Sequence, residues 1–71
     1  MILLMRGGLE DVAKACEAVA RDIPGAEYVG RHNRMSSGLA VYGARIPPES
    51  EAVAMEKARR NGITDFDRVT E

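Results

Sequence analysis

The sequence predicts a single α+β domain, residues 1–71, built as a two-layer sandwich of four strands and two helices. Three observations predict this class. Two long segments repeat apolar residues at the 3.6-residue period of a helix, and the shorter segments around them show the apolar runs or alternation of strands. Hydrophobic residues make up 45% of the chain and charged residues 30%, which is the balance of a folded globular protein.

Two glycines separate the first predicted strand from the first predicted helix. Residues 1–6, "MILLMR", form an apolar run too short for a typical helix, and the run ends at Gly7-Gly8. From residue 9 the apolar side chains follow one helical stripe, which consists of Leu9, Val12, Ala13, Cys16, Val19, Ala20 and Ile23. Acidic residues occupy the first turn, where the helix dipole favours them, and Pro24-Gly25 ends the helix.

The middle of the chain predicts two more strands. Residues 26–30, "AEYVG", have the composition of a strand, but past Gly30 neither alternation parity keeps charged residues off the apolar face, so we expect this strand to be short. Residues 38–46, "GLAVYGARI", resume the alternation. Leu39 and Val41 are the larger pair on one parity, and we expect them to face the core, with Tyr42 on the other side.

The last third of the chain predicts a helix and a strand. Pro48 is well placed to open a helix over residues 49–62, whose apolar face holds Ala52, Met55 and Ala58. Residues 65–71, "DFDRVTE", form the final strand. The order β, α, β, β, α, β favours a ferredoxin-like sandwich, with an antiparallel sheet in the order 4-1-3-2 and both helices on one face. An obligate dimer with exchanged strands would share this element order.

A basic segment, "RHNRMSSG" at residues 31–38, falls at the predicted hairpin between the second and third strands. The topology places Arg31, His32 and Arg34 at the same end of the domain as Arg6 and the start of the first helix. These four side chains are our candidate site for an anionic group of a partner. The alternative is an ordinary solvated turn, because Glu10, Asp11 and Asp65 lie at the same end and would offset the charge.

No motif in the sequence fixes an enzymatic chemistry, so we expect a non-enzymatic protein without a cofactor or a bound metal. The phosphate-loop and dinucleotide patterns are absent around Gly7-Gly8. Cys16 lies within the apolar helical stripe, which indicates a core residue and not a nucleophile. His32 has no second ligand or triad partner at a suitable spacing.

Charge and composition also restrict the partners and the compartment. The net charge is −1, and Tyr42 alone is placed to stack a base, which disfavours nucleic acid and leaves at most weak contacts of Arg side chains with RNA or a phosphate ligand. We expect no membrane insertion, because the longest apolar run is far below the about 20 residues of a membrane span. A single cysteine and the lack of a signal peptide pattern favour the cytoplasm.

The face of the sheet without helices is our candidate interaction surface. The first strand is apolar at every position from Met1 to Met5, so some apolar side chains must point away from the helices. We expect Leu3, Met5 and Tyr42 to lie on this open face and to contact a second copy of the chain or a protein partner with an acidic patch. Association would also help a chain this short, which buries only about 60% of its unfolded surface. The alternative is a small patch that is merely tolerated.

Two segments resemble a known family. Residues 39–69, "LAVYGARIPPESEAVAMEKARRNGITDFDRV", are similar to the second half of a SPOR (sporulation-related repeat) domain, and residues 3–20, "LLMRGGLEDVAKACEAVA", to the first half. This resemblance implies the same βαββαβ fold and the binding of peptidoglycan glycan strands on the sheet face. The chain departs from the family where Gly43 is followed by Ala44-Arg45, since the family favours proline and an aromatic residue there.

Overall fold

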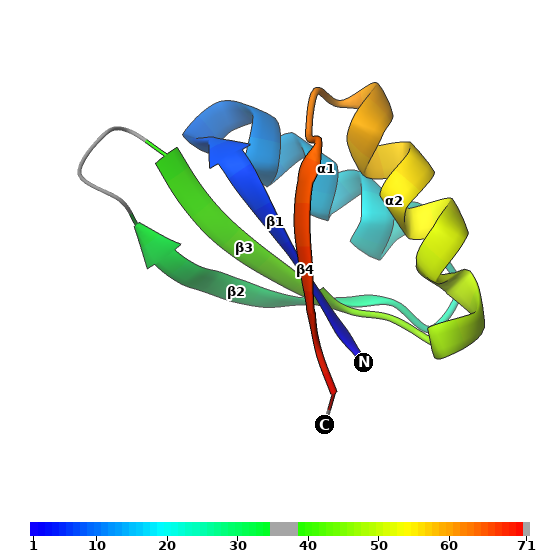
Figure 1. The fold of residues 1–71 in the computed structure, drawn as a ribbon. Coiled ribbons are helices and arrows are strands. Elements are labelled where there is room, and N and C mark those ends of the chain that lie inside the picture. The colour runs from blue at the N-terminus through cyan, green and yellow to red at the C-terminus, as the bar shows by residue number, and fades with distance from the viewer. Residues whose placement is uncertain (35–38, 71) are drawn as a thin grey trace.

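A computed structural model describes residues 1–34 and 39–70, and the side chains of all of these except residues 31–34. The described residues form a four-stranded antiparallel sheet in the order β2-β3-β1-β4, with both helices on one of its faces (Figure 1). The predicted α+β class and sheet order are confirmed. The elements are β1 (Ile2–Gly8), α1 (Leu9–Asp22), β2 (Glu27–Arg34), β3 (Leu39–Arg45), a 3-10 turn η1 (Pro48–Ser50), α2 (Glu51–Arg60) and β4 (Asp65–Val69).

Local sequence signals set the helix bounds. α1 begins directly after Gly8 with acidic residues in its first turn, and it ends where the Ile23 N–H donates to the Val19 carbonyl at 3.2 Å. Gly25 then adopts a φ of 81°, a conformation that glycine takes at little cost. α2 follows Pro48 and η1, and it ends at a turn in which Gly62 has a φ of 90°.

The core lies between the sheet and the helices, and it contains side chains that the sequence predicts for the other face. Leu3 and Met5 are 1% and 0% exposed within this core, and Tyr42 packs against it. The prediction that these three residues lie on the open face is therefore wrong. The prediction that Leu39 and Val41 face the core is also wrong. These two residues share the parity of Gly43 and lie on the open face, whereas Ala40 and Ala44 lie below the helices.

Small side chains explain this choice of parity. On the helix side of β1, a Cβ at Gly7 would lie 2.8 Å from the Ile63 Cδ1 atom and 3.4 Å from the Val12 Cγ2 atom. Ala40 and Ala44 flank Tyr42 on the same face of β3, so α1 packs close to the backbone of that strand. On β3, the helix side therefore carries Ala40 and Ala44 beside Tyr42, and Leu39 and Val41 point outward.

β2 is longer than the short strand that the sequence predicted. It runs over eight residues and pairs with β3 throughout, but the register shifts between Tyr28 and Gly30 and again between Arg31 and Asn33. Each shift is a bulge-like irregularity that changes the alternation of the strand. The parity conflict in the sequence is thus resolved by irregular pairing and not by ending the strand.

Candidate functional site

The helix-free face of the sheet has an apolar centre, which we call the open face. Its members, read from the strand registers, are Ile2, Leu4, Val29, Leu39, Val41, Gly43 and Val69. At the centre, a Cβ added to Gly43 would lie 3.1 to 3.2 Å from methyl carbons of Ile2, Leu4 and Val29. Glycine at this position of β3 therefore lets side chains of β1 and β2 approach each other over the middle of the sheet.

Exposure divides the open face into a covered centre and an exposed margin. Leu4 and Val41 are only 9% and 5% exposed although no helix covers them. Val29, Leu39 and Val69 are 41%, 37% and 39% exposed, and they surround that centre on β2, β3 and β4. The open face thus keeps several apolar side chains in contact with water around a centre that neighbouring side chains already shield.

Two ion pairs cross the open face between neighbouring strands. The Arg6 guanidinium donates to the Asp65 carboxylate at 3.0 Å, and these residues are direct register partners on β1 and β4. Arg45 and Glu27 form the second pair on β3 and β2, again as direct partners. The Nε atom of Arg6 is buried, so its side chain lies along the sheet and does not project from it.

One residue of the predicted anion site, Arg6, already forms an ion pair within the chain. Arg6 is held by Asp65, and the side chains of Arg31, His32 and Arg34 lie outside the described residues. Other cations at this end of the fold are also paired: Glu56 lies 3.9 Å from Arg59 and 3.4 Å from Arg60. The described residues therefore do not assemble an anion site, and the role of the hairpin cations stays a prediction.

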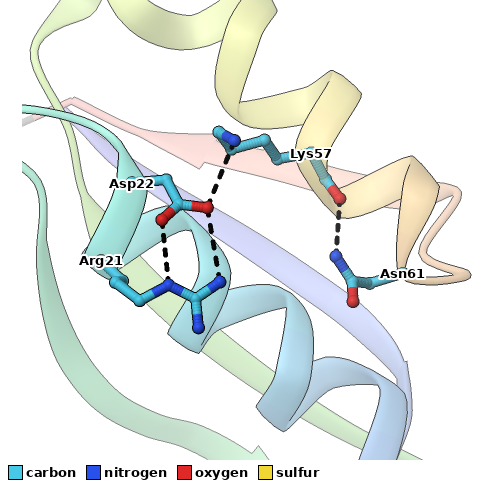
Figure 2. A network of polar contacts seen from close by, with 4 residues as sticks. All are labelled: Arg21, Asp22, Lys57 and Asn61. Carbon is cyan, nitrogen blue, oxygen red and sulfur yellow. Dashed lines mark hydrogen bonds and ion pairs between the residues drawn. The ribbon is translucent and has the colours of Figure 1, made fainter.

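A polar network joins the two helices at the end of α1. Arg21 donates to Asp22 at 2.9 and 3.4 Å, and Lys57 of α2 donates to the same carboxylate at 3.3 Å (Figure 2). The Asn61 amide donates to the Lys57 carbonyl at 2.9 Å, which fixes the end of α2. The hydrogen bond from Arg21 lowers the pKa of Asp22, so this carboxylate stays charged at neutral pH.

Cys16 is a buried core residue, as its place in the helical stripe predicted. Its side chain is 0% exposed, and burial raises the pKa of its thiol to about 12. A thiol with a raised pKa is a poor nucleophile, because the thiolate is the reactive form. Within residues 1–34 and 39–70, no group of three or more His, Cys, Asp and Glu side chains could hold a metal ion.

The apolar stripe of α1 extends beyond the part that the core covers. Val12, Ala15, Cys16 and Val19 are buried, whereas Ala13 is exposed and Ala20 is only half-buried. These two alanines line a groove that continues to Tyr28 and Tyr42 on the sheet. This groove was not predicted from the sequence. Its signal was that the predicted apolar stripe includes Ala13 and Ala20 in addition to the residues that the core buries.

Comparison of the chain with protein-family models, curated proteins and solved structures found no match. The resemblance to SPOR domains therefore stays a prediction. Among the described residues, neither helix has the length and apolar character that crossing a membrane requires.

Proposed function

We propose that the protein is a non-enzymatic interaction module that binds a protein partner through the open face of its sheet, and that this partner is a second copy of the chain. One observation carries the proposal. Exposed apolar side chains of three strands surround a covered apolar centre on a face that no helix packs against. Exposed apolar surface of this kind, bordered by charged residues, is typical of an interaction site.

Size and charge support a second copy as the occupant. The molecule is 33 by 25 Å across its broad sides, an outline comparable to the about 800 Å² that each partner buries in a standard interface. Two charged pairs on the open face, Arg6 with Asp65 and Arg45 with Glu27, are each compensated within one chain, and Asp67 adds one carboxylate opposite Leu4 at the β4 edge. Two copies would therefore meet without repulsion between these pairs, and no strongly charged partner is required.

The other expected functions have less support from the described residues. Glycan binding by a SPOR-like face would call for several hydrogen-bonding side chains at the centre of the sheet, where Leu4, Val41 and Gly43 lie with Asp67 beside them on β4. A partner with an acidic patch would engage the hairpin cations, and those side chains are outside the described part of the chain. We further infer a cytoplasmic location, since a single buried thiol suits a reducing compartment.

The test is the oligomeric state of three variants with one type of substitution. Val29→Asp and Val69→Asp place a carboxylate on the open face, and Val53→Asp places one on α2, where Val53 is 55% exposed in the helix layer. Sedimentation equilibrium should show a dimer for the wild type and for Val53→Asp. The dimer dissociation constant of each open-face variant should be at least about tenfold higher than that of the wild type, because a desolvated charge is costly in an apolar interface.

Two outcomes would contradict the proposal. A wild-type monomer at every concentration up to the solubility limit would show that a second copy is not the partner. Equal weakening by Val53→Asp would show that the effect does not arise on the open face. Urea unfolding of each variant serves as the control, because a change in oligomeric state can be interpreted only if the variant is folded.

A further inference from the structure

The groove between α1 and the β2–β3 hairpin is a second candidate site, independent of the open face. It has a volume of about 510 Å³, within the range of about 300 to 1,000 Å³ of small-molecule sites. It lies where α1 packs over β2 and β3. Its lining residues are Ala13, Cys16, Glu17, Ala20, Arg21, Tyr28 and Tyr42.

The two walls of the groove differ in shape. On the sheet side, the rings of Tyr28 and Tyr42 lie with their centroids 5.9 Å apart at an interplanar angle of 49°. On the helix side, Ala13 and Ala20 present single methyl groups about two turns apart on α1, with Cys16 on the turn between them. A thin ligand would therefore contact a low aliphatic wall and an aromatic wall, where ring stacking adds to the burial of apolar surface.

Within the described residues, one cation and one carboxylate line the groove, Arg21 and Glu17. Arg21 is held by Asp22, which also accepts a hydrogen bond from Lys57 (Figure 2), and Glu17 lies near enough to Arg21 to raise the pKa of its guanidinium further. The described lining therefore carries no net charge. An ion of either sign entering the groove would be poorly compensated, and an uncharged ligand would carry no such cost.

We propose that this groove binds a small, uncharged, planar aromatic molecule, stacked against the tyrosine wall and packed on the alanine wall. This activity goes beyond the proposed self-association, because the groove lies on the helix side of the sheet and shares no residue with the open face. Tyr28, which is 51% exposed, forms the outer part of the tyrosine wall.

The direct test uses N-phenyl-1-naphthylamine, an uncharged aromatic probe whose fluorescence rises in an apolar site. The chain has no tryptophan, so the probe signal is read without protein interference. Ala13→Leu fills the groove, and Ala52→Leu adds the same side chain to an exposed position of α2. The wild type and Ala52→Leu should bind one probe per chain, and Ala13→Leu should bind at about tenfold lower affinity or worse.

Two further variants and a second probe test where the ligand binds and whether it is uncharged. Tyr28→Ala should weaken the probe, because it removes one ring of the tyrosine wall. Val69→Asp should leave it unchanged, because Val69 lies on the open face. The proposal is overturned if no saturable binding occurs, if Ala13→Leu and Ala52→Leu behave alike, or if Val69→Asp is the variant that loses the probe. Tighter binding of the anionic relative 8-anilinonaphthalene-1-sulfonate would overturn the uncharged class.

Discussion

Replacing Cys16 with alanine should abolish a loss of stability that the wild-type protein shows at alkaline pH. The thiol is fully buried, and burial raises its pKa from 9.0 to about 12. The unfolded chain therefore ionises this group first as the pH rises. The stability that the protonated thiol contributes is complete below pH 9.0 and is lost progressively as the pH rises toward the folded pKa.

The size of the effect follows from the two pKa values. Between about pH 8 and about pH 10.5 the native thiol stays protonated while the unfolded thiol ionises, so the free energy of unfolding should fall by about 2 kcal/mol through Cys16. Cys16→Ala should cost about 1 kcal/mol at pH 8, because a buried sulfur is lost and a small cavity remains. The two proteins differ only at residue 16, so the difference between their stability losses isolates Cys16.

Urea unfolding followed by circular dichroism at the two pH values measures this difference. A thiol reagent gives a second readout, since Cys16 should react on unfolding and resist labelling in the native state. An equal alkaline loss of stability in both proteins would refute the reasoning. So would rapid labelling of native protein, because it would mean that the inner face of α1 is open to solvent.

Three further changes test the packing and the polar network. Gly7→Ala should cost about 1 to 3 kcal/mol in urea unfolding, because its Cβ would lie 2.8 Å from a buried methyl carbon of Ile63, and an unchanged midpoint would contradict the close packing. Gly62→Ala should cost about 1 kcal/mol because φ is 90°, whereas Gly8→Ala, at a φ of −59°, should cost less; equal costs would argue against the strained turn. Asp22→Asn should lower stability at neutral pH, and its difference from the wild type should shrink as the pH falls below 3.8, because the folded pKa of Asp22 is lowered; a difference independent of pH would oppose this.

The order of the elements could be predicted from local signals. Gly7-Gly8, Pro24-Gly25 and Asn61-Gly62 stand within two residues of element boundaries in the structure. The face of each strand could not be predicted in the same way. β1 is apolar at both parities from Ile2 to Met5, so periodicity carries no information there, and the packing of α1 and Ile63 against Gly7 decides the outcome.

The candidate site was predictable only in its general place. An apolar open face followed from the composition of β1, but its residues are Leu4, Val41 and their neighbours and not Leu3, Met5 and Tyr42. The expectation failed at β3, where the larger pair of side chains was assigned to the core. Close approach of a helix favours small residues, so a helix side built from alanines was the better reading.

The irregular pairing of β2 has a consequence for solubility. A straight edge strand offers an unbroken row of backbone donors and acceptors to which another chain can add, which is a route to aggregation. The two register shifts in β2 interrupt that row, and the opposite edge, β4, is short and carries Asp65, Asp67 and Arg68. Neither edge is a good template for a further strand. A chain built in this way can keep an apolar sheet face for a partner while its edges resist growth into fibrils.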